Sequence, residues 1–299
     1  MVIIMEKLLR NKFAIFWLVF PGFAIFAFAA LVPIICSIYF GMTEYRAGLN
    51  LDFIGLQNFK EILFNDKVFW KSLINNLYIG LSLVFIQHPM ALGFAILLDK
   101  VGGKAEKFFR AAYFTPAVIS ITVTCAMWVN MMNPEFGFIN QLLDMIGLGR
   151  LKMDWLGDPR SSLLSIIFII MWSGFGWAVL LYYAGVKGLP EDVYEAARID
   201  GSSGLHSFIK ITIPLLTPII SVNITFAIIS ALKTMTVVYL TTNGSVGDTT
   251  QVVANYLYKQ AFTSNRYGYG NAMSVLFVII CMIATILLNK LSKNKENEY

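Results

Sequence analysis

Charged side chains are scarce in this 299-residue chain. Only 14% of its residues are Asp, Glu, Lys or Arg, against about 25% in ordinary soluble domains. Apolar residues make up 57%, above the usual share of about 45 to 50%. This balance argues against a disordered or coiled-coil chain, a soluble enzyme, and a nucleic-acid-binding protein that uses its net charge of +5 to contact phosphates. The composition is that of an integral membrane protein.

Residues that usually carry chemistry are also few. His88 and His206 have no carboxylate or cysteine at ligand spacing, which argues against a metal or catalytic role. Cys36, Cys125 and Cys281 each lie inside an apolar run, so they predict neither a disulfide framework nor a zinc site. No G-x-x-x-x-G-K-[ST] phosphate loop occurs. We therefore expect no catalytic residue, no metal and no cofactor in this chain, and no ATP hydrolysis by the chain alone.

Six long apolar runs are present, and each exceeds the ~20 residues that a membrane-spanning helix needs. They are continuous over at least 22 residues, whereas the strands of a membrane barrel alternate over about ten. The predicted fold is therefore an all-α integral membrane protein with six transmembrane helices over residues 13–290, between an N-terminal segment 1–12 and a tail 291–299. The runs are Phe13–Phe40, Leu73–Leu98, Ala111–Met132, Ser161–Val186, Ile211–Leu240 and Tyr267–Asn289.

The first run has one alternative interpretation, a cleaved signal peptide. Basic residues precede it, and Ala27-Phe28-Ala29 resembles a cleavage triplet. A signal peptide has an apolar region of about 7 to 15 residues, but this run continues for 11 residues past Ala29. The sequence therefore favours an uncleaved first span.

The distribution of basic residues predicts the orientation in the membrane. Thirteen of the 23 Lys and Arg residues lie in the termini and in the second and fourth connections, and nine lie in the three longer connections 41–71, 133–160 and 241–266. Because cytoplasmic segments carry the excess of positive charge, we expect both termini and the loop 188–210 to be cytoplasmic. The three longer connections would then face outward, either as partner-binding surfaces or as interfacial anchors.

Lys233 is the one charged residue well inside an apolar run. An intramembrane charge suggests a functional site, so Lys233 could contact a cavity or a substrate. Alternatively, Lys233 lies seven residues before Leu240, about 10 Å along a helix, and its long stem could reach the outer interface. The sequence leaves both interpretations open.

The loop 188–210 contains the start and stop signals of a short helix. Pro190 suits the first helical position, acidic residues follow it, Arg198 falls in the last turn and Gly201 comes just past the end. These signals predict a helix of about three turns under the membrane. Its small apolar face comprises Leu189, Val193 and Ala197.

This segment carries a family resemblance. The run Glu195-Ala196-Ala197-Arg198-Ile199-Asp200-Gly201, followed by Phe208, Ile211, Pro214 and Pro218, resembles the EAA loop of permease subunits of binding-protein-dependent ABC importers. The chain from Phe20 onward is similar to the carbohydrate branch of that family, which includes maltose, multiple-sugar and glycerol-phosphate importers. The supporting segments are 133–137 (NPEFG), 155–159 (WLGDP), 187–190 (KGLP) and 267–270 (YGYG).

Three departures from the family pattern are visible. Ser202 stands where the family usually has Ala, and Leu205 where an aromatic residue is often found. After the fifth span the chain has Asn243-Gly244-Ser245 in place of Gly-Gly-Pro. The last departure leaves open the detail of that outer loop and the identity of the sugar.

The resemblance implies a permease subunit in a bacterial cell membrane. It would pair with a second permease, two ATP-binding subunits that hold ATP and Mg, and an extracellular sugar-binding protein, with no nucleic acid involved. It implies that the loop helix couples the spans to the ATPases, through Glu195, Ala196, Ala197, Asp200 and Gly201. It further implies that the sugar pathway passes the fourth and fifth spans, at Ser173, Gly174, Ala227, Ser230, Ala231 and Thr234.

Other interpretations are weaker but remain. An ion-coupled secondary transporter would be expected to carry acidic residues inside its spans, and the six runs contain none. A membrane-embedded enzyme or assembly factor would need a polar catalytic cluster, which the sequence does not show. Within the importer interpretation, the solute could be an amino acid, a phosphate ester or a peptide instead of a sugar.

Overall fold

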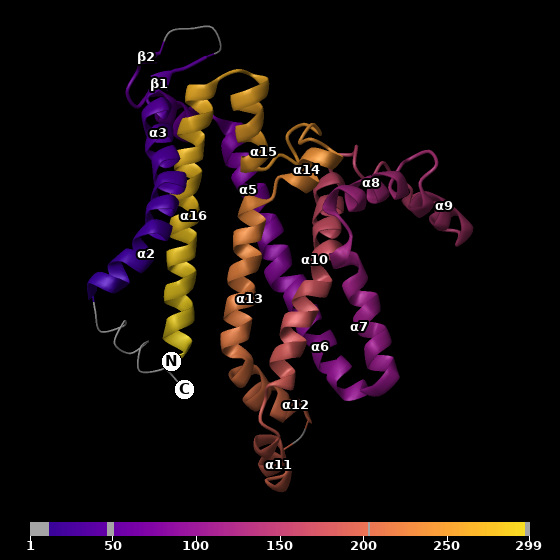
Figure 1. The fold of residues 1–299 in the computed structure, drawn as a ribbon. Coiled ribbons are helices and arrows are strands. Elements are labelled where there is room, and N and C mark those ends of the chain that lie inside the picture. Colours follow the sequence, from indigo (N-terminus) through magenta and orange to yellow (C-terminus); the bar gives the residue numbers. More distant parts are fainter. Residues whose placement is uncertain (1–11, 47–50, 203, 297–299) are drawn as a thin grey trace. The chain divides into compact units, whose positions relative to one another are not determined.

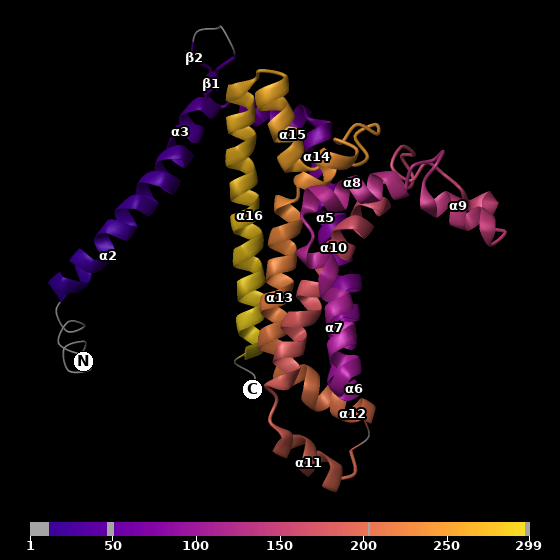
Figure 2. The ribbon, with the colours of Figure 1, turned by 45° about the vertical axis from the view of Figure 1, so that its right-hand side comes forward.

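The computed structural model describes residues 12–46, 51–202 and 204–296, so most of the predicted segment 1–12 and the end of the tail lie outside the described residues. The all-α membrane fold is confirmed. Within these described residues, five helices are long and apolar enough to cross a membrane, and a pair of helices bent by 96° makes up to six if it counts as one span. The chain divides into two compact units, residues 1–65 with 257–279 and residues 66–256 with 280–299. Figure 1 and Figure 2 show the ribbon.

The first unit contains the first span and most of the connection that follows it. The span is one continuous helical segment, Ile15–Gly41, whose most apolar part is not buried in the chain. At its end Gly41 lies so close to Ala272 that a Cβ atom added to Gly41 would be 3.0 Å from the Ala272 nitrogen. The elements are α2 (Lys12–Phe26), η1 (Ala27–Leu31), α3 (Val32–Gly41), β1 (Thr43–Glu44), β2 (Asp52–Phe53), α4 (Gln57–Lys60), η2 (Glu61–Asn65), η6 (Lys259–Thr263) and the start of α16 (Tyr267–Glu296).

The second unit holds the other spans except the last, Tyr267–Leu287, which begins in the first unit. Its second span is continuous over Lys67–Val101 but contains a π-helical turn at Leu83–Gln87. The elements are α5 (Lys67–Ser82), η3 (Leu83–Gln87), α6 (His88–Val101), α7 (Gly103–Val118), α8 (Ile121–Met131), α9 (Phe138–Met145), η4 (Gly149–Leu151), α10 (Ser162–Lys187), α11 (Glu191–Ile199), α12 (Gly204–Ser207), η5 (Phe208–Thr212), α13 (Ile213–Lys233), α14 (Thr236–Thr241) and most of α15 (Val253–Tyr258).

Small residues let the helices of the second unit pack closely. Ala91 and Ala95 of α6 are fully buried against Tyr182 of α10 in one apolar cluster. Gly176 of α10 lies against the backbone of α7 at Tyr113 and Phe114, where a side chain would not fit. Because lipid and core are equally apolar, such close backbone approach is a main source of helix association in membranes. The helices α6, α7 and α10 therefore form one tightly packed group.

Two of the six apolar runs are interrupted in the structure. The run Ala111–Met132 breaks at Ile119 and Ser120, which are extended, and α8 leaves α7 at 96°. Pro116 removes one helical donor just before the break. The run Ile211–Leu240 breaks at Thr234 and Met235 before the short helix α14. An apolar run shows that a segment suits lipid, but it does not show that the segment is straight.

Candidate translocation cavity and coupling loop

A cavity of about 520 Å³ lies within the second unit. It is bounded by η3 and α6, by the middle of α10, by α13, and by the break between α13 and α14. Its walls combine apolar and aromatic side chains with hydroxyl and amide groups. The polar residues that line it are Gln87, His88, Ser173, Asn223, Ser230, Lys233, Thr234 and Thr236.

Five of the six residues predicted for the pathway line this one cavity: Ser173, Gly174, Ala227, Ser230 and Thr234. Ala231 does not line it. Its methyl group faces α5, where a Cβ atom on Gly80 would lie 3.5 Å away. Thr234 directly follows the last residue of α13 (ψ 119°), and its hydroxyl donates to the Ser230 carbonyl oxygen at 2.9 Å.

Gln87 was missed by the sequence analysis. It ends the π-helical turn of the second span, a kind of irregularity that often occurs at functional sites. Its side chain is only 5% exposed, and its Oε1 atom has no hydrogen-bond partner among the described residues. The amide lies next to Gly174, since a Cβ added there would be 3.3 Å from Gln87 Nε2. The one available signal was an amide beside His88-Pro89 inside an otherwise apolar run.

Lys233 lines the cavity at the last residue of α13. Of the two interpretations that the sequence left open, contact with a cavity is the one that the geometry matches. The helix end beside it is braced by Asn76 of α5, whose Nδ2 donates to the carbonyl oxygens of Ala231 (2.7 Å) and Leu232 (3.3 Å). These carbonyls would otherwise extend the helix, so the bonds explain why α13 stops here.

The predicted loop helix is present as α11. Pro190 caps its start instead of occupying the first helical position. Its end is a complete Schellman turn: Gly201 N donates to Arg198 O (3.1 Å), and Ser202 N donates to Ala197 O (2.9 Å). Gly201 has φ +75°, a conformation that favours glycine.

The predicted coupling residues lie together on this helix and its terminal turn. Glu195, Ala196, Asp200 and Gly201 are exposed, and Ala197 is half-buried. In both views α11 projects from the end of α10 and α13 that is opposite to α14 (Figure 1 and Figure 2). The helix is therefore available to a partner at that end of the second unit.

One side-chain hydrogen bond joins this loop to the base of α13, and a second holds the loop together internally. The hydroxyls of Tyr194 and Thr212 are 2.8 Å apart, and those of Ser202 and Ser207 are also 2.8 Å apart. Thr212 is buried and directly precedes α13. The base of α10 is held differently, by an ion pair of 2.7 Å between Lys187 and Asp99 of α6.

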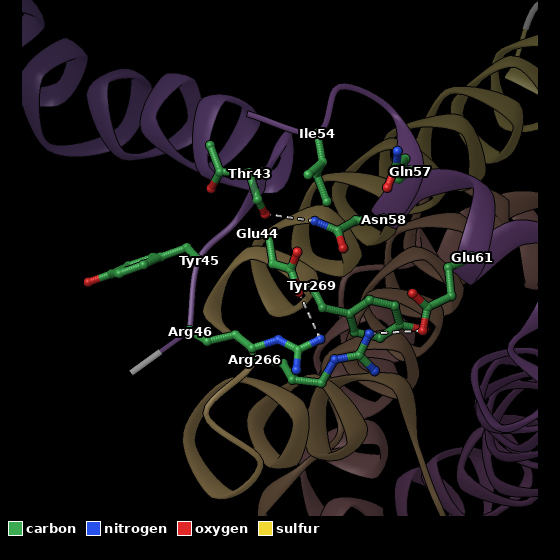
Figure 3. Close-up of a pocket in the computed structure, with 10 residues that line it drawn as sticks. All are labelled: Thr43, Glu44, Tyr45, Arg46, Ile54, Gln57, Asn58, Glu61, Arg266 and Tyr269. Atoms are coloured by element: carbon green, nitrogen blue, oxygen red, sulfur yellow. Dashed lines mark hydrogen bonds and ion pairs between the residues drawn. The ribbon is translucent and has the colours of Figure 1, made fainter. Parts of the chain in front are cut away.

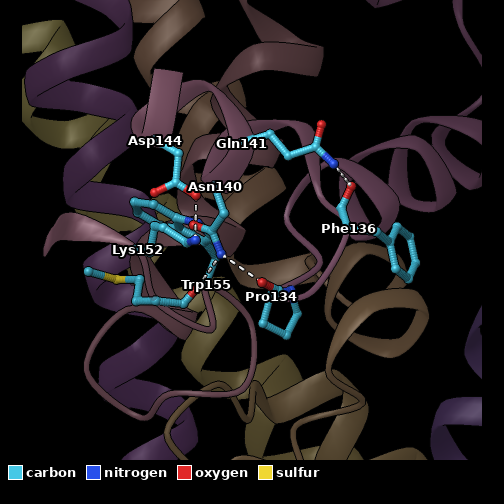
Figure 4. Close-up of polar contacts among 8 residues, drawn as sticks. Pro134, Phe136, Asn140, Gln141, Asp144, Lys152 and Trp155 are labelled. Atoms are coloured by element: carbon cyan, nitrogen blue, oxygen red, sulfur yellow. Dashed lines mark hydrogen bonds and ion pairs between the residues drawn. The ribbon is translucent and has the colours of Figure 1, made fainter. Parts of the chain in front are cut away.

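At the other end of the second unit, the connection between α8 and α10 is folded around Asn140 (Figure 4). Its Nδ2 donates to the carbonyls of Pro134 (3.2 Å) and Met153 (3.0 Å), and its Oδ1 accepts from Trp155 Nε1 at 2.9 Å. Lys152 pairs with Asp144 at 2.5 Å. These contacts give the connection a defined shape, which a surface that receives a partner requires.

The first unit has a folded connection of its own around Asn58 (Figure 3). Asn58 is buried and donates to the carbonyls of Gly41 and Thr43, both at 3.0 Å. Arg266 pairs with Glu61 at 2.9 Å and lies 4.1 Å from the centre of the Tyr269 ring. The β1–β2 hairpin is thereby fixed to the start of α16.

Comparison with known proteins defines the class. Residues 90–296 match the family model described as "Binding-protein-dependent transport system inner membrane component". The chain belongs to this family, as the sequence resemblance predicted, and it is a transport component of an ABC importer, embedded in the membrane, rather than an enzyme.

Relatives with more specific names cover nearly the whole chain. The chain is 33% identical to the "Probable ABC transporter permease protein YurN" of Bacillus subtilis, over 97% of this chain and 99% of that protein. It is 29% identical to the "Diacetylchitobiose uptake system permease protein NgcF" of Streptomyces coelicolor, over 95% and 84%. The fold resembles a chain in the crystal structure of a bacterial alginate ABC transporter complex, with a TM-score of 0.84, 21% identity and coverage of 97% and 96%.

Proposed function

We propose that the chain forms half of the transmembrane pathway for a sugar in an ATP-driven importer. The observation that carries this proposal is the cavity, in which Gln87, Asn223 and Ser230 offer hydrogen bonds and Trp177 offers an aromatic face. Sugars present hydroxyl edges and apolar C–H faces, so these groups match both. The names of the relatives support a sugar as well, since they include diacetylchitobiose, multiple-sugar and trehalose/maltose permeases.

The partners follow from the family. A second permease would complete the pathway, two ATP-binding subunits would hold ATP and Mg and contact α11, and a solute-binding protein would deliver the sugar. We place α11 and both termini in the cytoplasm, because the termini and the second and fourth connections carry the larger share of the basic residues. Cytoplasmic segments carry the excess of positive charge. The protein then lies in a bacterial cell membrane, with Asn140 and its connection facing outward.

Coupling requires that α11 moves and that the cavity responds. Ala196 and Ala197 are small enough to let an ATPase groove approach closely, Glu195 and Asp200 supply charge around them, and Gly201 permits the tight turn that ends α11. Movement of α11 would pass to α13 through Tyr194 and Thr212. Three residues of α13 that line the cavity, Asn223, Ala227 and Ser230, would move with it. This is rigid-body switching between two states that the ATPases contact differently.

Two substitutions test the loop. Replacing Ala197 with Arg should leave the chain inserted but weaken ATPase binding or uncouple hydrolysis from uptake. Gly201→Val should act similarly, since a β-branched residue at φ +75° costs about 1 kcal/mol or more. Gly204→Val is the matched control, because a Cβ atom there meets open space and Gly204 has no positive φ.

The measurements are co-purification of the ATPase subunits, ATP hydrolysis, and uptake of labelled sugar by proteoliposomes. The control variant should resemble the wild type in all three. Normal uptake by both Ala197→Arg and Gly201→Val in an intact complex would show that α11 is not the coupling element. Uptake of an amino acid or peptide by the wild type, with no sugar carried, would replace the sugar part of the proposal.

A further inference from the structure

The cavity carries one formal charge, and that charge is positive. Among the described residues that line it, Lys233 is the only Lys, Arg, Asp or Glu. In the part of the chain that the structure describes, Lys233 forms no ion pair, and its side chain is exposed at the cavity wall. A cation on the wall of a membrane cavity has no intramolecular compensation here.

We propose that the solute is an anionic saccharide whose negative group binds the Lys233 ammonium. This inference rests on the proposed function and names the substrate class of the same cavity. A neutral sugar would displace water from the Lys233 ammonium without supplying a negative charge in its place. An ammonium that is desolvated and unpaired has a high free-energy cost. An anionic group restores both the hydrogen bonds and the charge balance.

A structural role for Lys233 at the end of α13 is already met by other groups. A lysine at a helix C-terminus can bind the last carbonyls. Here, however, Asn76 Nδ2 donates to both Ala231 O and Leu232 O, and the Thr234 backbone N–H also points to Ala231 O at 3.4 Å. The helix end therefore has donors of its own, and the ammonium is free to bind a ligand.

A second polar atom in the cavity fits the same ligand. Gln87 Oε1 is buried, lines the cavity and has no donor among the described residues. A saccharide hydroxyl can donate to this oxygen, and Ser230 can bind another. An ammonium for the anionic group together with an amide oxygen for a hydroxyl defines a two-point site, which a neutral sugar satisfies only in part.

The test uses the complete importer in proteoliposomes, with its binding protein and ATP. The probes are labelled hexoses and hexose trisaccharides in 6-carboxylate, 6-phosphate and 6-sulfonate forms, each paired with its neutral parent. We expect the wild type to carry at least one anionic probe in preference to its neutral parent. Lys233→Gln should reduce uptake of that probe by about 10- to 100-fold, the range for losing one charged hydrogen bond, and Lys233→Arg should restore part of it.

Lys107→Gln is the control, because Lys107 is exposed on α7 and does not line the cavity. It should carry the anionic probe at the wild-type rate. The anionic form that is carried identifies the group as carboxylate, phosphate or sulfonate. Wild-type transport of neutral probes alone, or an unchanged rate for Lys233→Gln, would overturn the inference while leaving the sugar permease in place. Transport of neither class by an intact, hydrolysing complex would instead count against the proposed function.

Discussion

Gly174 on α10 lies against the Gln87 side chain of the second span at the wall of the cavity. The space beside the Gly174 Cα atom is too small for a side chain unless the Gln87 amide shifts. A Cβ atom at position 174 would lie 3.3 Å from Gln87 Nε2. Two spans that are far apart in sequence thus meet where the predicted pathway runs.

We therefore expect Gly174→Ala to lower uptake and Gly174→Trp to abolish it. Overpacking such a contact costs about 1 to 3 kcal/mol, and an indole would fill the cavity as well. The check is labelled-sugar uptake alongside ATP hydrolysis, which should persist in both variants. Gly93→Trp is the control, since a Cβ there has nothing within 4 Å, and it should transport normally. Wild-type uptake by Gly174→Trp would move the pathway elsewhere.

Gln87→Met should separate transport from stability. The substitution removes a buried acceptor that has no partner, and such a group costs about 1 to 3 kcal/mol when unsatisfied. We expect the melting temperature in detergent to stay the same or rise while uptake falls. Ser72→Ala removes another buried group that lacks a partner in the described chain but does not line the cavity, and its uptake should be unchanged. A parallel loss of uptake in both variants would contradict a specific role for Gln87.

Tyr194→Phe and Thr212→Val should each raise the number of ATP molecules hydrolysed per sugar carried. Each removes the 2.8 Å bond between α11 and the base of α13, worth about 1 kcal/mol. Because both variants break one contact, the double variant should be no worse than either alone. Thr217→Val is the control, since that hydroxyl donates only within α13, to Ile213 O. Additive losses would show that the two residues act separately.

Orientation can be tested with an impermeant thiol reagent on intact cells. The native cysteines are first replaced, because Cys36 is exposed. Single cysteines at the exposed positions Gln141 and Arg160 should be labelled from outside, and those at Lys104 and Asp192 should not. Asn140 is unsuitable as a labelling site because it is buried and holds Trp155. The reverse pattern would place α11 outside the cell.

Local signals predicted the parts of this structure that depend on neighbouring residues. The helix α11 and its turn followed from Arg198, Gly201 and the acidic first turn, and the structure gives Gly201 the positive φ that the turn needs. Family spacing led to six residues predicted for the pathway, and five of them line one cavity. Ala231 was predicted for the pathway but does not line the cavity. Family spacing fixes a position along α13, but it does not show which side of that helix faces the cavity.

The breaks depend on contacts between distant segments, which no local pattern shows. Asn76 ends α13 by binding Ala231 O and Leu232 O, 155 and 156 residues away in sequence. In the sequence, Gln87 is one more residue of an apolar span. In the structure, η3 places its amide in the wall of the cavity. The sequence could not place Lys233 beside a cavity, because that depends on where α13 ends.

One measurement tests directly whether this chain is half of an ATP-driven pathway. The second permease, the ATPase subunits and the binding protein are reconstituted with this chain in proteoliposomes, and sugar uptake is measured with ATP, without ATP, and with an imposed proton or sodium gradient. We predict uptake only with ATP and the binding protein, and none from either gradient. Uptake driven by a gradient in the absence of ATP would contradict the account and favour a secondary transporter.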